Sequence, residues 1–168
     1  MDHYFDARVF FPHQNSSEVF VELTLPNSLN FPMAKTWQQK FDNGRTPVLE
    51  SADKDWAGIP AGEKFLISTP AEIDAYIRKI PEGKAVSFAT LKRDIALDHG
   101  TEYMCPLTAG IFTRIVAELA HEKMQQGTPP DMVTPFWRVI DLKMPLAKKL
   151  SFGTDFLREK RNAEGLPV

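Results

Sequence analysis

The chain has only one cysteine and very little net charge. The single thiol, Cys105, excludes an internal disulfide framework and a Cys-based zinc cage, and it is typical of a reducing compartment. Lys and Arg number 20 against 22 Asp and Glu, a net charge of -2, which argues against a generally basic nucleic-acid coat but not against a local basic face. No apolar run approaches the roughly 18 residues of a membrane helix. The N-terminus also lacks a signal-peptide pattern, so we expect a cytoplasmic protein with no membrane partner.

Residue patterns that hold metals or drive common catalysis are also missing. The four histidines (His3, His13, His99 and His121) are scattered without ligand spacing, so we expect no metal site and no cofactor. Paired catalytic carboxylates, glycine-rich phosphate loops and a Ser/His/Asp order are likewise absent from the sequence. What the chain does have is 168 residues, 43% of them hydrophobic and 25% charged, as in one globular domain.

Residues 1–32 differ in composition from the rest of the chain. They contain no lysine but five of the 12 phenylalanines, and Glu18–Leu25 partly alternates as a strand would. A lone strand is not stable by itself, so it must pair with the body or stay loose. A second interpretation places the biological start at Met33 and makes the leader a translation artefact. Residues 33–67 then form an extension with an amphipathic piece at Trp37–Phe41 and a short strand at Lys64–Ile67.

Helical signals become clear from residue 68 onward. Thr69 and Glu72 form a capping box before a helix whose buried stripe includes Ile73, Ile77 and Ile80. Ser87 caps a second helix, from Phe88 to about His99. We expect a third helix from Pro106, a short strand at Trp137–Ile140 and a closing helix at 154–163. In the third helix, the apolar band is Ile111, Phe112, Ile115, Val116 and Leu119, and the outward positions include Thr108, Arg114, Glu118, His121 and Glu122.

The predicted fold is therefore mainly α with a few short strands. Helix, turn, helix, turn, longer helix and short strand is the outline of a winged-helix-like helix-turn-helix domain over residues 68–168, behind a short N-terminal extension. Function does not follow from such an outline, because many small helical domains share it.

Four motifs in order make the resemblance more specific. They are Ile80-Pro-Glu-Gly-Lys-Ala-Val-Ser-Phe88 followed by Leu91, Thr134-Pro-Phe-Trp-Arg-Val-Ile140, Phe152-Gly153 and Glu164-Gly165. Together they resemble the DNA-binding domain of methylguanine-DNA methyltransferases and their alkyltransferase-like relatives. Cys105–Phe112 and 134–138 are similar to a divergent branch of that family. The resemblance implies a winged-helix fold that binds double-stranded DNA.

The departures from that family concern the chemistry. Phe136 stands at the acceptor cysteine and Trp137 at the histidine that relays its proton, and neither side chain can do that work. Glu164 matches the acid of the relay, but with nothing to orient we expect it to be a surface or end-of-helix carboxylate. Phe88 replaces a tyrosine, Gly110 stands at the intercalating arginine and Thr128 at the hinge asparagine. Repair by the family's mechanism is therefore not expected.

The resemblance leaves a non-catalytic DNA-binding protein that recognises alkylated or damaged bases. Its backbone contacts are predicted at Ser87, Phe88, Lys92, Thr108, Gly110 and Arg114. Its base pocket is predicted from Phe88, Thr128, Phe136, Trp137 and Arg138, with Phe136 stacking on an extruded base.

Three alternatives stay open at the level of sequence. Phe136 and Trp137 are either simply core aromatics beside a strand or part of a base pocket, in which case adjacent strand positions put one in the core and the other in the pocket. Glu118 and Glu122 would repel a duplex unless they point away, and the near-neutral third helix favours a protein-interaction module with no DNA binding. Cys105 is either a small core residue or, at a helix start, a reactive thiol.

Overall fold

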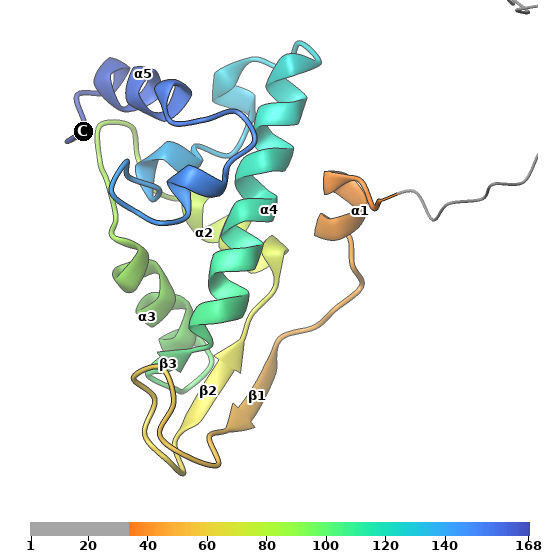
Figure 1. Ribbon diagram of the computed structural model, residues 1–168, viewed down its shortest axis with the longest axis vertical. Coiled ribbons are helices and arrows are strands. Elements are labelled where there is room, and N and C mark those ends of the chain that lie inside the picture. Colours follow the sequence, from red (N-terminus) through yellow and green to blue (C-terminus); the bar gives the residue numbers. More distant parts are fainter. Residues whose placement is uncertain (1–33) are drawn as a thin grey trace, which may run out of the picture. The chain divides into compact units, whose positions relative to one another are not determined.

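The computed structural model describes residues 34–168, and α-helices make up most of its regular structure (Figure 1). This confirms the mainly-α expectation. The leader, its expected strand at Glu18–Leu25 and the alternative start at Met33 lie outside the described residues. The helices are α1 (Trp37–Phe41), α2 (Pro70–Arg78), α3 (Phe88–Asp98), α4 (Pro106–Gln125) and α5 (Asp155–Ala163). Single 3-10 turns are η1 (Pro130–Met132), η2 (Phe136–Arg138) and η3 (Ala147–Lys149).

A small three-stranded sheet lies at one end of α4 (Figure 1). Strand β2 (Lys64–Ile67) is the predicted one, and it pairs antiparallel with β1 (Val48–Ser51) and parallel with β3 (Tyr103–Met104). The strand β3 was not predicted, because two residues are too few to show a periodic pattern. The Cys105 N–H donates to the Leu66 carbonyl at 2.8 Å, so the start of α4 is tied directly to the sheet.

Local capping sets the start of α2 as the sequence predicts. Thr69 Oγ1 accepts from the Glu72 N–H, Glu72 Oε2 accepts from the Thr69 N–H, and both distances are 3.3 Å. Pro70 occupies the first turn, and Ile73 and Ile77 are fully buried. The capping box therefore satisfies backbone donors at the helix start while the isoleucine stripe fixes the helix on the core.

The long helix α4 runs between two hydrophobic clusters. Phe112, Ile115 and Val116 pack with α2, α3 and β2, whereas Ala117 and Ala120 pack with η2 and α5. Since opposite faces of α4 are buried, a one-sided pattern describes it poorly. Two expectations are corrected as a result: Ile111 is 49% exposed rather than part of the buried band, and Glu118 is 2% exposed rather than outward.

Residues 137–140 do not form the expected strand. The segment is the 3-10 turn η2, in which the Val139 and Ile140 N–H groups donate to the Phe136 carbonyl at 3.1 and 2.9 Å. The preceding proline starts the turn, and no neighbouring strand pairs with it among the described residues. Alternation of faces therefore does not apply, and both Phe136 and Trp137 are buried. The closing helix is confirmed as α5.

Candidate nucleic-acid interface and an adjoining cavity

Three of the predicted DNA contacts lie together at the start of α3. Ser87 is exposed and caps the helix, its Oγ accepting from the Thr90 N–H at 3.0 Å. Phe88 is half-buried against the first cluster, and Lys92 Nζ lies 5.5 Å from the centre of its ring. The α3 start thus presents a hydroxyl, an aromatic ring and an ammonium group on adjoining turns.

The predicted contacts on α4 are placed differently from one another. Thr108 Oγ1 donates to the Cys105 carbonyl at 3.3 Å, and a Cβ added at Gly110 would meet nothing within 4 Å. Arg114 Nε donates to Glu118 Oε1 at 3.3 Å, and its guanidinium carbon lies 5.6 Å from the Trp37 ring of α1. Arg114 is therefore already engaged within the protein. The exposed side chains of the first turns are Leu107 and Ile111.

Positive charge is concentrated between the end of α2 and the first turns of α3, although α3 as a whole has two basic and two acidic side chains. Residues 78–93 contain five basic side chains and one acidic one, whereas the whole chain carries -2. Of the five, Lys92 is half-buried and the other four are exposed: Arg78, Lys79, Lys84 and Arg93. Only Lys92 among them was predicted from the sequence as a DNA contact, because the third helix was expected to carry the positive face that meets DNA. A running charge count along the chain shows the cluster directly.

The Phe136 side chain has no exposed surface and lies inside a cluster of aromatic rings. Its ring centre is 5.5 Å from that of Phe152, 6.1 Å from that of Phe156 and 5.4 Å from that of Trp137. His121 of α4 stacks on Phe152 at 4.0 Å, and burial lowers the pKa of this imidazole, although the Glu118 charge acts in the opposite direction. An extruded base would have to displace these rings before it could stack on Phe136.

Glu118 of α4 is buried beside Ser151, the residue that precedes Phe152. Its carboxylate accepts hydrogen bonds from the Ser151 N–H at 2.9 Å, from the Ser151 hydroxyl and from Arg114. A buried carboxylate with three donors is compensated for its lost hydration. Glu118 therefore does not point outward, and the repulsion of a duplex that the sequence suggested for it is not expected.

Glu164 is the centre of a buried hydrogen-bond network. It accepts from Trp137 Nε1 at 2.6 Å, from Arg138 Nε and Nη2 at 2.8 and 2.9 Å, and from the Gly83 N–H at 3.3 Å. Burial alone would raise the pKa of Glu164, but these hydrogen bonds and the Arg138 charge outweigh it and lower the pKa. Glu164 is the C-cap of α5, an end-of-helix position as expected, but the expectation that it has nothing to orient is wrong.

The network also holds the turn between α2 and α3. Arg138 Nη1 donates to the Ile80 carbonyl at 2.7 Å, and the Val86 N–H donates to the Arg138 carbonyl at 2.9 Å. Arg161, buried in α5, donates to the Trp137 carbonyl at 2.6 Å. Residues far apart in sequence therefore fix the segment that carries Lys84 and leads into the Ser87 cap.

The predicted base-pocket residues are divided between different parts of the protein. Phe88 packs against the first cluster, whereas Phe136 and Trp137 belong to the second. Thr128 follows the end of α4, where its N–H donates to the Lys123 carbonyl at 3.0 Å.

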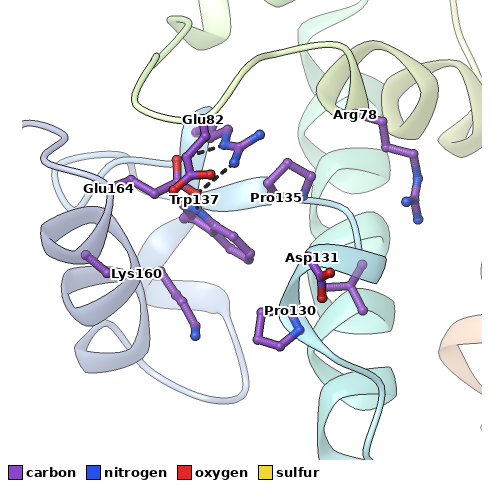
Figure 2. Close-up of a pocket in the computed structure, with 11 residues that line it drawn as sticks. Arg78, Glu82, Pro130, Asp131, Pro135, Trp137, Lys160 and Glu164 are labelled. Carbon is purple, nitrogen blue, oxygen red and sulfur yellow. Dashed lines mark hydrogen bonds and ion pairs between the residues drawn. The ribbon is translucent and has the colours of Figure 1, made fainter.

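Trp137 and Arg138 instead line a cavity of about 340 Å³ (Figure 2). Its other lining residues are Arg78, Glu82, Pro130, Asp131, Val133, Pro135, Lys160, Ala163 and Glu164. Segments far apart in the sequence build this cavity, so no local motif reveals it.

Cys105 is 5% exposed and packs with Ala52, Ile59 and Phe65 beneath the start of α4. Of the two alternatives for this thiol, this placement is that of a small core residue. Within residues 34–168, no group of three His, Cys, Asp or Glu side chains is arranged to hold a metal. None of the helices in that range combines the length and apolarity that a bilayer crossing requires.

Comparison with protein-family models, curated proteins and solved structures gave no match to this chain. The resemblance to alkyltransferase-like proteins rests on the four ordered motifs alone.

Proposed function

We propose that this chain is a non-catalytic, alkyltransferase-like protein that binds double-stranded DNA. In this proposal α3, the turn through β3 and α4 act as a helix-turn-helix, and η2 takes the place of a wing. The order of the four motifs supports it, and so does the positive charge of residues 78–93. The protein binds without transferring an alkyl group, because a phenyl ring at position 136 has no nucleophilic atom.

The observation that carries the proposal is the positive charge of residues 78–93. Phosphate contacts supply most of the affinity of a DNA-binding protein, and they come from Lys and Arg on the docked surface. Lys84, Lys92 and Arg93 flank the exposed Ser87 cap, which adds a hydroxyl donor. These four residues form what we call the α3 surface. Contact through it does not require Arg114, which is engaged within the protein.

Recognition of an alkylated base is the finer part of the proposal. Stacking is worth about 1–3 kcal/mol per base, against an extrusion cost of a few. Because Phe136 has no exposed surface, the aromatic rings around it must open first. A preference for alkylated duplex would therefore be modest, while binding to undamaged duplex remains.

Duplex binding measured at two salt concentrations tests the proposal. The triple variant Lys84→Ala/Lys92→Ala/Arg93→Ala should weaken binding at least tenfold at about 50 mM salt. It should also reduce the slope of log affinity against log salt by about 3, one unit for each lost phosphate contact. Duplexes with and without an alkylated guanine report the base preference in the same assay.

A matched triple variant removes the same charge elsewhere. Lys148, Lys149 and Arg158 lie on η3 and α5 and are exposed, so their replacement by alanine should leave most of the affinity. Negligible binding of the unmodified protein to both duplexes would refute the proposal. Equal losses in the two triple variants would assign the affinity to net charge rather than to the α3 surface.

A protein-interaction module is the second candidate, favoured by exposed apolar side chains on α4. Leu107 is 63% exposed and Ile111 is 49% exposed, and the two lie one turn apart. Leu107→Lys/Ile111→Lys separates the two candidates, because added positive charge strengthens contact with DNA but disrupts an apolar protein contact. Retained or increased duplex affinity in this variant favours DNA binding.

A further inference from the structure

The cavity beside Trp137 contains several charged side chains, and most of its positive charge is neutralised internally. Arg138 forms its ion pair with Glu164 at 2.8 Å, and Arg78 Nε pairs with Asp74 Oδ2 at 2.8 Å. Glu164 is saturated further by Trp137 and Gly83. These four charges therefore offer little to a ligand.

Three charged side chains of the cavity are left over. Among the described residues 34–168, no ion pair involves Lys160, Glu82 or Asp131. The nearest aromatic interaction of Lys160 is weak, with Nζ 5.4 Å from the Phe156 ring centre. Figure 2 shows Lys160 reaching from α5 beneath the Trp137 ring, with Asp131 and Pro130 on the opposite side. The cavity therefore has a cationic wall at Lys160 and an anionic wall at Asp131, while Glu82 lies away from Asp131, next to Glu164.

Apolar side chains lie between these two walls. Pro130, Pro135 and Val133 line the cavity beside the indole of Trp137, and proline has no backbone N–H. Helix α2 ends at the cavity, at Arg78. Helix C-termini carry partial negative charge, which favours an ammonium group nearby.

We propose that this cavity binds a small zwitterion, namely a free apolar amino acid or a dipeptide. Its ammonium group lies toward Asp131, its carboxylate pairs with Lys160, and its side chain packs on the prolines and Trp137. An anion alone would meet the Asp131 carboxylate, and a cation alone would meet Lys160. The volume of about 340 Å³ suits a small ligand. This binding is independent of the proposed contact with DNA.

Titration of the full chain with four probes tests the charge requirement. L-leucine and leucyl-leucine carry both charges, N-acetyl-leucine lacks the ammonium group and leucinamide lacks the carboxylate. Chemical-shift changes of the Trp137 indole N–H and the Ala163 amide should saturate with one or both zwitterions. Both singly charged probes should bind at least tenfold more weakly, as expected for one lost charge-assisted hydrogen bond. Equal affinity for all probes, or no saturation by about 50 mM, overturns the proposal.

Variants of the two walls test the assignment of the ends. Lys160→Met keeps the aliphatic stem and Asp131→Asn keeps the shape, and each should weaken the better zwitterion about tenfold. Lys149→Met and Asp155→Asn change the same charges outside the cavity lining and should have no effect. Unchanged affinity in both wall variants refutes the site. The same variants should bind duplex DNA as tightly as the unmodified protein does. Failure of the zwitterion proposal can therefore be distinguished from failure of the DNA-binding proposal.

Discussion

Phe136 stands at the position where the resemblance places the acceptor cysteine, and its surroundings define what this side chain does. The Phe136 ring has no exposed surface and lies among Phe152, Phe156 and Trp137. Its contribution is therefore to packing, which for a buried phenylalanine is worth about 3–5 kcal/mol relative to alanine. The neighbouring Trp137 donates to Glu164 and has no lone pair with which to accept a proton.

A thiol introduced at position 136 should not confer alkyl transfer. We expect Phe136→Cys to destabilise the protein by about 3 kcal/mol and to acquire no labelled methyl group from a duplex with an alkylated guanine. The reason is that Trp137 cannot generate the thiolate. Mass spectrometry after incubation with the duplex measures this, with Phe136→Ala as the control. A covalent methyl adduct on the introduced thiol of that variant, or anywhere on the unmodified protein, would contradict the non-catalytic proposal.

At the scale of elements, one hydrogen bond links α2 to α3. Tyr76 Oη donates to Asp94 Oδ2 at 2.5 Å, and burial, together with this bond and the Asp94 charge, raises the pKa of Tyr76 to about 12. The neutral phenol is thus favoured in the folded state. Since an unfolded tyrosine titrates near 10, this contribution to stability is complete below about pH 10 and is lost as the pH rises to 12.

Alkaline unfolding isolates that link. The free energy of unfolding, measured with denaturant at about pH 9 and about pH 11.5, should fall more in the unmodified protein than in Tyr76→Phe, which has no phenol to ionise. Tyr103→Phe, on β3, is the matched control and should keep the full decrease. An identical decrease in Tyr76→Phe would show that the α2–α3 bond does not set the alkaline limit.

At the scale of the whole described unit, α4 joins two cores, and His121 and Glu118 hold it to the C-terminal one. The neutral imidazole of His121 stacks on Phe152 and meets Phe156 edge-on at 5.0 Å. Burial lowers its pKa below the usual 6.5. Neutral His121 therefore favours folding above about pH 6.5, and that contribution is lost as the pH falls through the lowered pKa.

Acid should consequently loosen the C-terminal core first. Between about pH 7 and about pH 5, the unmodified protein should lose stability that His121→Leu does not lose, because leucine has no proton to take up. Hydrogen exchange of α5 amides, followed over the same range, should rise earlier than that of α2 amides. If both helices and both proteins respond alike, His121 is not the group that responds to acid.

Local chemistry explains the parts of the fold that the sequence alone predicts. The capping box of Thr69 and Glu72 and the Ser87 cap act over three residues, so composition near each helix start suffices. The helical spacing of Ile73 and Ile77 needs only one core on one side. Failures occurred where a second core was present: Glu118 and Ile111 were misplaced because α4 is buried on two faces.

The sequence by itself determined the helical class, the strand β2, the helix starts and the absence of a nucleophile at position 136. Tertiary structure alone decided that Phe136 fills a core, that Glu164 binds Trp137, Arg138 and Gly83, and that Lys160 faces Asp131 across a cavity. The physical reason is separation along the chain. A cap or a helical stripe is settled between residues within a few positions, whereas these contacts join segments 16 to 81 positions apart.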